Sequence, residues 1–237
     1  MFQYYDKAVR GTENEDKLVI LQFLSGMIGQ TFSFLNYYKE IPVSYDSTLL
    51  SVENEMAEFA IHEYQAKVIS LERKALIYSH AKSPYSEDMI GEAFYVNSVR
   101  KRAILCNFAY ARIRSDMRRF VRVQLDHPVE VDLVHDDDIL KGNVKDISLG
   151  GAAMSVMDSD RLVPGSNVGI VLKLPDSQSN SVVEVEAEAT IVKITGESAP
   201  FSCIIEIHSD KHSQQQIAHY INQRQVEIIR ELKDINA

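Results

Sequence analysis

The second half of the chain alternates between apolar and polar residues in a way that predicts half-buried β-strands. From Val129 to Leu133, apolar residues alternate with carboxylates, and the stretch from Val183 to Ile191 repeats the pattern. Successive side chains of a strand point to opposite faces, so this period places one face in a core and the other in water. Further strands are predicted at 140–147, 152–156, 168–174 and 201–207. Short strands separated by Pro- and Gly-containing turns predict an antiparallel barrel or sandwich.

A second, helical period appears near both ends of the chain. Apolar residues recur three or four positions apart over 13–30 and over about 211–233. Thr12 or Asn14 can cap the first helix, and acidic residues follow in its first turn. Between 31 and 113, segments rich in β-branched and aromatic residues predict strands at 31–37, 58–64, 67–71, 75–79, 93–99 and 103–113.

These patterns predict a mainly β protein of two domains. The first, residues 1–112, is a small β-rich, split-barrel-like domain with a leading helix, in which no chemical constellation is evident. The second, residues 113–237, comprises an arginine linker at 112–122, a barrel at about 119–208 and a closing helix at about 211–233. The uncharged stretch from Leu18 to Tyr38 is interrupted by polar residues, so no membrane span is predicted.

The charge distribution limits the kinds of partner that the protein is expected to bind. The net charge of −9 argues against a nucleic-acid binder, yet seven of the twelve arginines lie between Arg100 and Arg122, a segment that carries +7. A cationic segment in an acidic protein favours a compact anion or an acidic surface as its partner. Cys106 and Cys203 are far apart in the sequence, which fits a reducing cytoplasmic setting and excludes a cysteine-based metal site.

Two short motifs carry the candidate chemistry. Arg118 and Arg122 form an R-x-x-x-R, and Asp146, Ser148 and Gly151 form a D-x-S-x-x-G. Arginine offers a fork of donors that fits phosphate oxygens and the guanine O6/N7 edge, whereas an ionised aspartate accepts the N–H groups of guanine. Serine donates to phosphate, and glycines at 150 and 151 permit positive φ and close approach of a ligand. Together the motifs predict a binding site for a guanine nucleotide.

Residues 114–233, about half of the chain, resemble the PilZ domain family, whose members are receptors for cyclic di-GMP. The resemblance rests on the R-x-x-x-R before the first barrel strand and the D-x-S-x-x-G some two dozen residues later. It implies a six-stranded antiparallel barrel with a closing helix, and ligand contacts from Arg118, Arg122, Asp146, Ser148 and Gly151. The secondary candidates for ligand contact are Arg114, Arg119 and Gly150. The first half loosely resembles the N-terminal domain of two-domain YcgR-like PilZ proteins.

The expected function is therefore a cytoplasmic cyclic di-GMP receptor that changes its inter-domain arrangement to regulate a downstream protein partner. Motility, biofilm formation or virulence is the expected kind of output, and a homodimer is compatible with the apolar final helix. The expectation includes no catalysis, cofactor, nucleic acid or metal, although His208 and His212 have helical spacing for a metal ion.

Two alternatives remain at this point. The arginine pair could instead be Arg114 and Arg118, which form the same motif four residues earlier. The protein could also be a docking module with a degenerate nucleotide site, whose arginine-rich linker binds an acidic protein partner or an anionic lipid.

Overall fold

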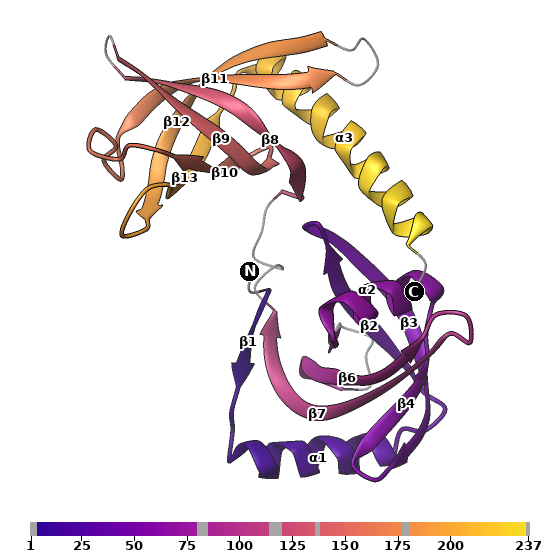
Figure 1. The fold of residues 1–237 in the computed structure, drawn as a ribbon. Helices are drawn as coiled ribbons and strands as arrows, with labels where there is room; N and C mark the ends of the chain where they lie inside the picture. The colour runs from indigo at the N-terminus through magenta and orange to yellow at the C-terminus, as the bar shows by residue number, and fades with distance from the viewer. Residues whose placement is uncertain (1–3, 80–84, 114–119, 136–137, 177–180, 236–237) are drawn as a thin grey trace. The chain divides into compact units, whose positions relative to one another are not determined.

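The computed structural model describes residues 4–79, 85–113, 120–135, 138–176 and 181–235. The chain divides into two compact units (Figure 1). The first comprises Met1–Tyr38, Pro42–Arg118 and Arg230–Ala237, and the second comprises Lys39–Ile41 and Arg119–Ile229. The boundary expected between residues 112 and 113 falls at the end of strand β7 (Arg102–Ile113).

The first unit is a β-barrel-like sheet with two helices. Its strands are β1 (Tyr5–Ala8), β2 (Thr31–Tyr38), β3 (Ile41–Glu53), β4 (Met56–Ala60), β5 (Lys74–Ile77), β6 (Met89–Asn97) and β7. They are ordered β1-β7-β4-β3-β2-β5-β6, and β6 also pairs with β7, which closes a circuit of six strands with β1 added at its edge. Phe32, Phe34, Phe59 and Phe108 are almost fully buried in the core of this unit.

Helix α1 (Glu13–Ser25) begins and packs as its sequence dictates. Thr12 is its N-cap: its hydroxyl accepts the Glu15 backbone N–H at 3.2 Å, and the Glu15 carboxylate accepts the Thr12 N–H at 2.9 Å. This capping box satisfies two donors that a helix start leaves unpaired. Ile20, Leu21 and Leu24 are buried against the sheet. The helix ends at Ser25, five residues earlier than predicted, and the chain enters β2 at Thr31.

Helix α2 (Glu63–Glu72) corrects the sequence prediction, which placed a strand at 67–71 and continued the strand at 58–64 beyond the end of β4 at Ala60. The prediction followed the β-branched and aromatic residues, but burial here follows helical spacing, with Gln65, Ala66, Val68 and Ile69 buried. His62 caps the helix start through its Nδ1, and Arg73 ends it in the left-handed conformation. Tertiary packing therefore overrides the strand propensity of this segment.

Strand β3 was missed by the sequence prediction because its buried face is not wholly apolar. Val43, Ser47 and Leu49 are all buried and lie an even number of residues apart. Ser47 is only 1% exposed, and a serine at a core position hides the period of two that marks a strand.

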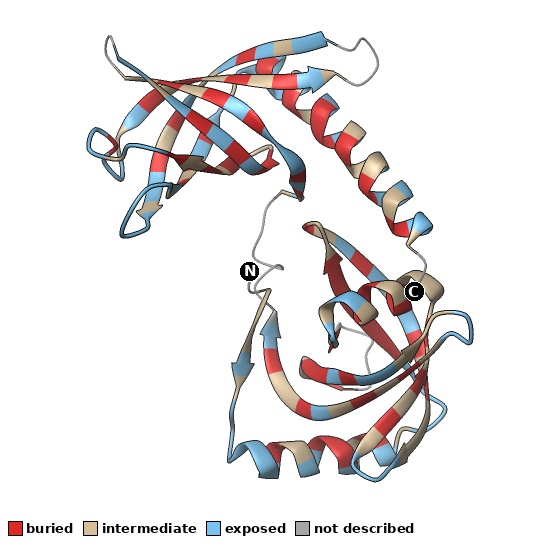
Figure 2. Cartoon of the chain, viewed as in Figure 1, coloured by how far each residue is buried: buried red, intermediate tan, exposed pale blue. Residues whose placement is uncertain are grey.

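The second unit is a closed antiparallel barrel followed by a helix. Its strands are β8 (Arg122–His135), β9 (Asp138–Ser148), β10 (Gly151–Val156), β11 (Asn167–Asp176), β12 (Ser181–Thr195) and β13 (Phe201–His208), in the order β10-β13-β12-β11-β8-β9. Figure 2 shows buried and exposed residues alternating along these strands. The inward side chains, such as Val131, Leu172 and Ile205, are at most 1% exposed. Helix α3 (Lys211–Asp234) follows β13.

The mainly β, two-domain fold is confirmed, including the six-stranded barrel with its final helix. The alternation over 129–133 and 183–191 lies in β8 and β12, and the strands predicted at 140–147, 152–156, 168–174 and 201–207 correspond to β9, β10, β11 and β13.

Candidate functional site

The candidate site lies where the first barrel strand begins and the β9–β10 hairpin turns. Strands β8 and β9 are antiparallel, with Arg122 opposite Ser148 and Gln124 opposite Asp146. Val123 and Ile147, the residues between, are fully buried in the barrel core. Because side chains alternate across a strand, Arg122, Asp146 and Ser148 share the opposite face. The structure thus brings together one residue of the arginine motif and two of the D-x-S-x-x-G.

Asp146 is an ionic residue with no exposed surface. Its side chain is 0% exposed, and its Oδ1 lies 3.2 Å from Nη1 of Arg122, whose side chain is 25% exposed. A buried carboxylate needs a cationic partner, because removing an unpaired charge from water costs on the order of several kcal/mol. Arg122 is therefore both the counter-ion of Asp146 and a cation that reaches the surface.

Ser148 and Gly151 close the hairpin that follows Asp146. They face each other across strands β9 and β10, and the Ser148 hydroxyl donates to the Gly151 carbonyl at 3.1 Å. This bond fixes the serine side chain beside the ion pair, with only 6% of the residue exposed.

The two glycines are required for a different reason from the one expected. Neither Gly150 nor Gly151 has positive φ, so the expected conformational role is wrong. A Cβ on Gly151 would lie 2.4 Å from the Ile205 carbonyl oxygen, and a Cβ on Gly150 would lie 2.7 Å from Cδ2 of Phe120. Close approach of the β13 backbone and of an aromatic ring excludes a side chain at these positions.

Phe120 is a site residue that the sequence reasoning did not single out. Its ring lies against Gly150, directly beside the hairpin that carries Ser148 and Gly151. Spacing in the sequence does not reveal this contact, because Phe120 and Gly150 are far apart along the chain. Three predicted arginines, Arg114, Arg118 and Arg119, lie outside the described residues.

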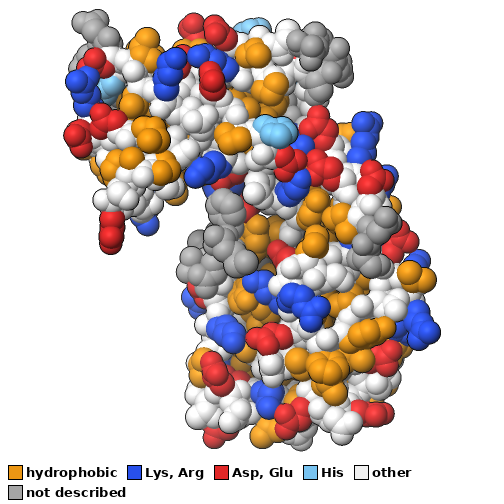
Figure 3. Space-filling view, viewed as in Figure 1, with side chains coloured by type: hydrophobic (Ala, Val, Ile, Leu, Met, Phe, Trp, Pro, Cys, Tyr) orange, Lys and Arg blue, Asp and Glu red, His pale blue; other side chains and the backbone are white. Residues whose placement is uncertain are grey.

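The cationic segment of the sequence is divided in space by strand β7. Arg100, Lys101 and Arg102 lie at the β6–β7 turn, at the start of β7, whereas Arg112 is near its other end and Arg122 begins the barrel. On the face seen in Figure 3, Lys and Arg are interspersed with Asp and Glu on both units. Among the described cations of the first unit, those at 100–102 therefore lie at the opposite end of β7 from Arg112.

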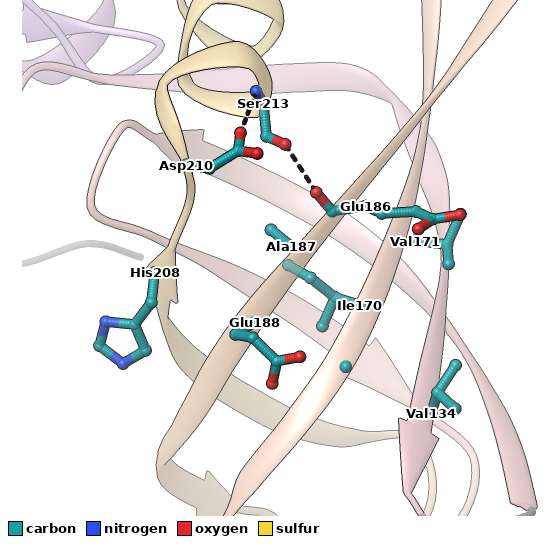
Figure 4. A pocket seen from close by; sticks show the side chains of 10 residues that line it. Val134, Ile170, Val171, Glu186, Ala187, Glu188, His208, Asp210 and Ser213 are labelled. Atoms are coloured by element: carbon teal, nitrogen blue, oxygen red, sulfur yellow. Dashed lines mark hydrogen bonds between the residues drawn. The ribbon is translucent and has the colours of Figure 1, made fainter.

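A separate cleft of about 540 Å³ lies on the outer side of the barrel near the start of α3 (Figure 4). Its walls include Glu186, Glu188 and His208, none of which was a predicted site residue. Asp210 accepts the Ser213 backbone N–H at 2.7 Å, and this bond is the main cause that lowers the pKa of Asp210. The Ser213 hydroxyl donates to the Glu186 carbonyl, which ties the helix to β12.

Metal-ligating side chains do not converge in the part of the chain that the structure describes: no group of three or more His, Cys, Asp or Glu is placed to hold an ion. His208, one of the two histidines with helical spacing, has its Nε2 at 2.8 Å from the Thr190 hydroxyl.

The family comparison bears directly on this site, because residues 116–223 match the model of the PilZ domain. This span includes Arg118, Arg122 and the whole D-x-S-x-x-G motif. The chain carries a PilZ domain. The resemblance inferred from the two motifs is confirmed.

Similar proteins align with most of the length of the chain. An uncharacterized protein from Aquifex aeolicus (strain VF5) is 25% identical and aligns with 86% of this chain and 92% of its own. YcgR from Escherichia coli, solved in complex with c-di-GMP, is 12% identical, with coverage of 98% and 97% and a TM-score of 0.44. The Bacillus subtilis inhibitor of motility (MotI/DgrA) is 16% identical, with coverage of 84% and 97% and a TM-score of 0.43.

Among the helices of the described ranges, none has the length and apolar character needed to cross a bilayer.

Proposed function

We propose that this PilZ protein is a cyclic di-GMP receptor without catalytic activity. The observation that carries the proposal is the meeting of its two motifs: Arg122, the last residue of the R-x-x-x-R, lies 3.2 Å from Asp146 of the D-x-S-x-x-G. Both motifs lie inside the span that matches the PilZ family. YcgR, one of the similar proteins, is known in complex with this ligand.

The chemistry of the site suits a guanine dinucleotide. The Arg122 guanidinium, partly exposed, presents donors that fit a phosphate or the O6/N7 edge of guanine. Asp146 accepts hydrogen bonds from guanine N–H groups, and the Ser148 hydroxyl is a further polar contact. Arg118, four residues before Arg122, is the second arginine of the proposal, and the contact of Arg122 with Asp146 supports this register over Arg114 and Arg118.

The second part of the proposal concerns the response. Without ligand, the positive charges of the linker at 112–122 repel one another. The two phosphates of cyclic di-GMP offset this repulsion and let the arginines close over the ligand. Closure changes the arrangement of the two units and thereby regulates a downstream protein. A ligand shifts such an equilibrium only by its differential affinity for the two states. The free thiols Cys106 and Cys203 fit the cytoplasm as the place of action.

Calorimetric titration with cyclic di-GMP tests the receptor proposal. We expect the wild-type protein to bind and Arg118→Ala and Arg122→Ala to lose about tenfold to hundredfold in affinity, as for loss of a bidentate guanine contact. Ser148→Ala probes the site without removing a buried charge. Arg161→Ala is the matched control, because Arg161 is an exposed arginine of the same unit that pairs with Asp138. Absence of binding by the wild-type protein would contradict the proposal.

One observation favours a second candidate, a docking module with a degenerate nucleotide site. Arg122 and Asp146 form an ion pair with each other, so this pair can stabilise the barrel rather than bind a ligand. The arginine-rich linker would then bind an acidic protein partner directly. An absence of nucleotide binding in the wild-type protein, with partner binding that survives charge reversal at Asp146, would favour this function.

A further inference from the structure

The β6–β7 hairpin of the first unit presents apolar side chains to solvent. Val99 at its turn is 87% exposed, and Phe94 and Tyr95 on β6 are 63% and 45% exposed. Isolated exposed apolar residues are common on protein surfaces and need no explanation. Here three exposed apolar residues lie within six residues of one hairpin, at an edge of the first unit (Figure 1), and such a group does need an explanation.

A β-bulge produces this exposure. The pairing of β6 with β7 shifts register between Ala93 and Tyr95, so Phe94 is an extra residue on its strand. A bulge breaks the strict alternation of faces and redirects a side chain. As a result the two consecutive aromatic residues, Phe94 and Tyr95, are both exposed, whereas Ala93 remains in the core.

Asn97 organises the tip of the hairpin. Its side-chain oxygen accepts the Arg100 backbone N–H at 2.7 Å, and its amide donates to the Tyr95 hydroxyl at 3.0 Å. The turn then passes through Lys101, which has positive φ. The aromatic ring of Tyr95 is thereby linked to the turn residues instead of moving independently.

Three consecutive cations follow the apolar tip. Arg100 and Lys101 are exposed, and the Arg102 side chain is 40% exposed, with its Nε 3.8 Å from Glu58 Oε1. Strand β7 extends from Arg102 to Ile113, so these cations lie a whole strand away from the linker that leads to Arg122. They are a separate cationic feature that the proposed nucleotide site does not use.

We propose that this hairpin tip, residues 94–102, docks on an anionic lipid surface. Aromatic side chains are favoured at the boundary between headgroups and acyl chains, and each lysine or arginine beside an anionic leaflet strengthens binding by about fivefold. The net charge of −9 does not prevent this, because charges further than about 8–10 Å from the surface are screened. The very high exposure of Val99 suits insertion of a turn into a bilayer interface better than sideways packing against a protein.

Vesicle flotation with the full chain tests this docking site. The probes are vesicles of phosphatidylcholine alone and vesicles with about one third phosphatidylglycerol, an anionic lipid that models a negative leaflet. We expect binding to the anionic vesicles only, weakened by salt. Because two cations are replaced, Arg100→Glu with Lys101→Glu should reduce binding at least about twentyfold. The matched control is Lys141→Glu with Lys193→Glu, which makes the same change in net charge at exposed positions of the other unit.

A second variant separates insertion from simple charge attraction. Phe94→Ser with Val99→Ser keeps every charge, and we expect it to weaken binding as well. Thermal unfolding followed by circular dichroism checks that all variants fold. Equal binding of wild-type protein to both kinds of vesicle, no binding to either, an equal loss in the control pair, or full binding by the serine variant would each overturn the proposal.

Discussion

Gly151 lies so close to strand β13 that a single methyl group there collides with the backbone. A Cβ would be 2.4 Å from the carbonyl oxygen of Ile205, and backbone cannot rotate away as a side chain can. We expect Gly151→Ala to lower the free energy of unfolding by about 1–3 kcal/mol, the usual cost of overpacking. Urea denaturation measures the change.

Gly169→Ala is the matched control for this prediction. Gly169 is also a strand glycine of the barrel without positive φ, but a Cβ there meets its nearest atom, Cβ of Val134, at an ordinary 3.5 Å. The control should be nearly neutral. If both variants lose the same stability, the close approach at Gly151 is not the cause.

Cys203 is a buried thiol that should resist modification until the barrel unfolds. It is 0% exposed, and burial raises its pKa to about 11, so it is protonated at neutral pH. Only the thiolate is an effective nucleophile. In a Cys106→Ser variant at pH 8, we expect the native protein to react far more slowly with a thiol reagent than the urea-unfolded protein. Rapid labelling of the native variant would mean that the barrel opens readily around β13.

At the residue scale, the sequence was most informative where chemistry restricts the residue type. Arg122, Asp146 and Ser148 were predicted from two motifs, and the structure brings them onto one face. Phe120 was not predicted to be part of the site, because its role depends on a contact with Gly150, and spacing in the sequence alone does not reveal that contact. The close approach of Ile205 to Gly151 is likewise a property of the barrel, not of the local sequence.

At the scale of elements, predictability depended on whether apolar residues mark the buried face. Strand β12 was predicted because carboxylates occupy one face and apolar residues most of the other. Helix α2 was predicted as strands because its buried positions include Gln65 and Ala66, which a search for β-branched runs passes over. Thus elements whose core face holds polar or small residues are the ones that local pattern cannot assign.

The start of α3 gives a pH-dependent prediction at this scale. The backbone N–H of Ser213 binds the Asp210 carboxylate and holds its pKa below the ordinary 3.8. A carboxylate whose pKa is lowered by folding stabilises the folded state above its unfolded pKa, and the contribution is lost as pH falls through the folded pKa. We therefore expect Asp210→Ala to lower the Tm by a few degrees at pH 7, with the difference disappearing as pH drops well below 3.8.

Asp210→Asn separates the cap from its charge. Asparagine is also a good N-cap, so this variant should keep most of the stability at pH 7 and show little change between pH 7 and pH 3 relative to Asp210→Ala. A difference between Asp210→Ala and the wild-type protein that stays constant down to pH 2 would contradict the role of the ionised carboxylate.

For the whole molecule, the division into two units allows each part of the proposal to be tested separately. Each unit has its own buried core and closes its own circuit of strands. The cyclic di-GMP site is proposed in the second unit and the lipid-docking hairpin in the first, so variants in one should leave the function of the other intact. Arg100→Glu with Lys101→Glu should therefore bind cyclic di-GMP with wild-type affinity in the same calorimetric experiment.

Small-angle X-ray scattering of the free and saturated protein tests the proposed change in arrangement. We expect the radius of gyration to change on addition of cyclic di-GMP, because the linker between the units carries the arginines that would bind its phosphates. Arg122→Ala should show no change at the concentration that saturates the wild-type protein, whereas Arg161→Ala should respond fully. Identical scattering profiles with and without saturating ligand would remove the conformational part of the proposal. A positive calorimetric result would still stand in that case, and the ligand would then act by altering the surface of the barrel around Arg122 itself.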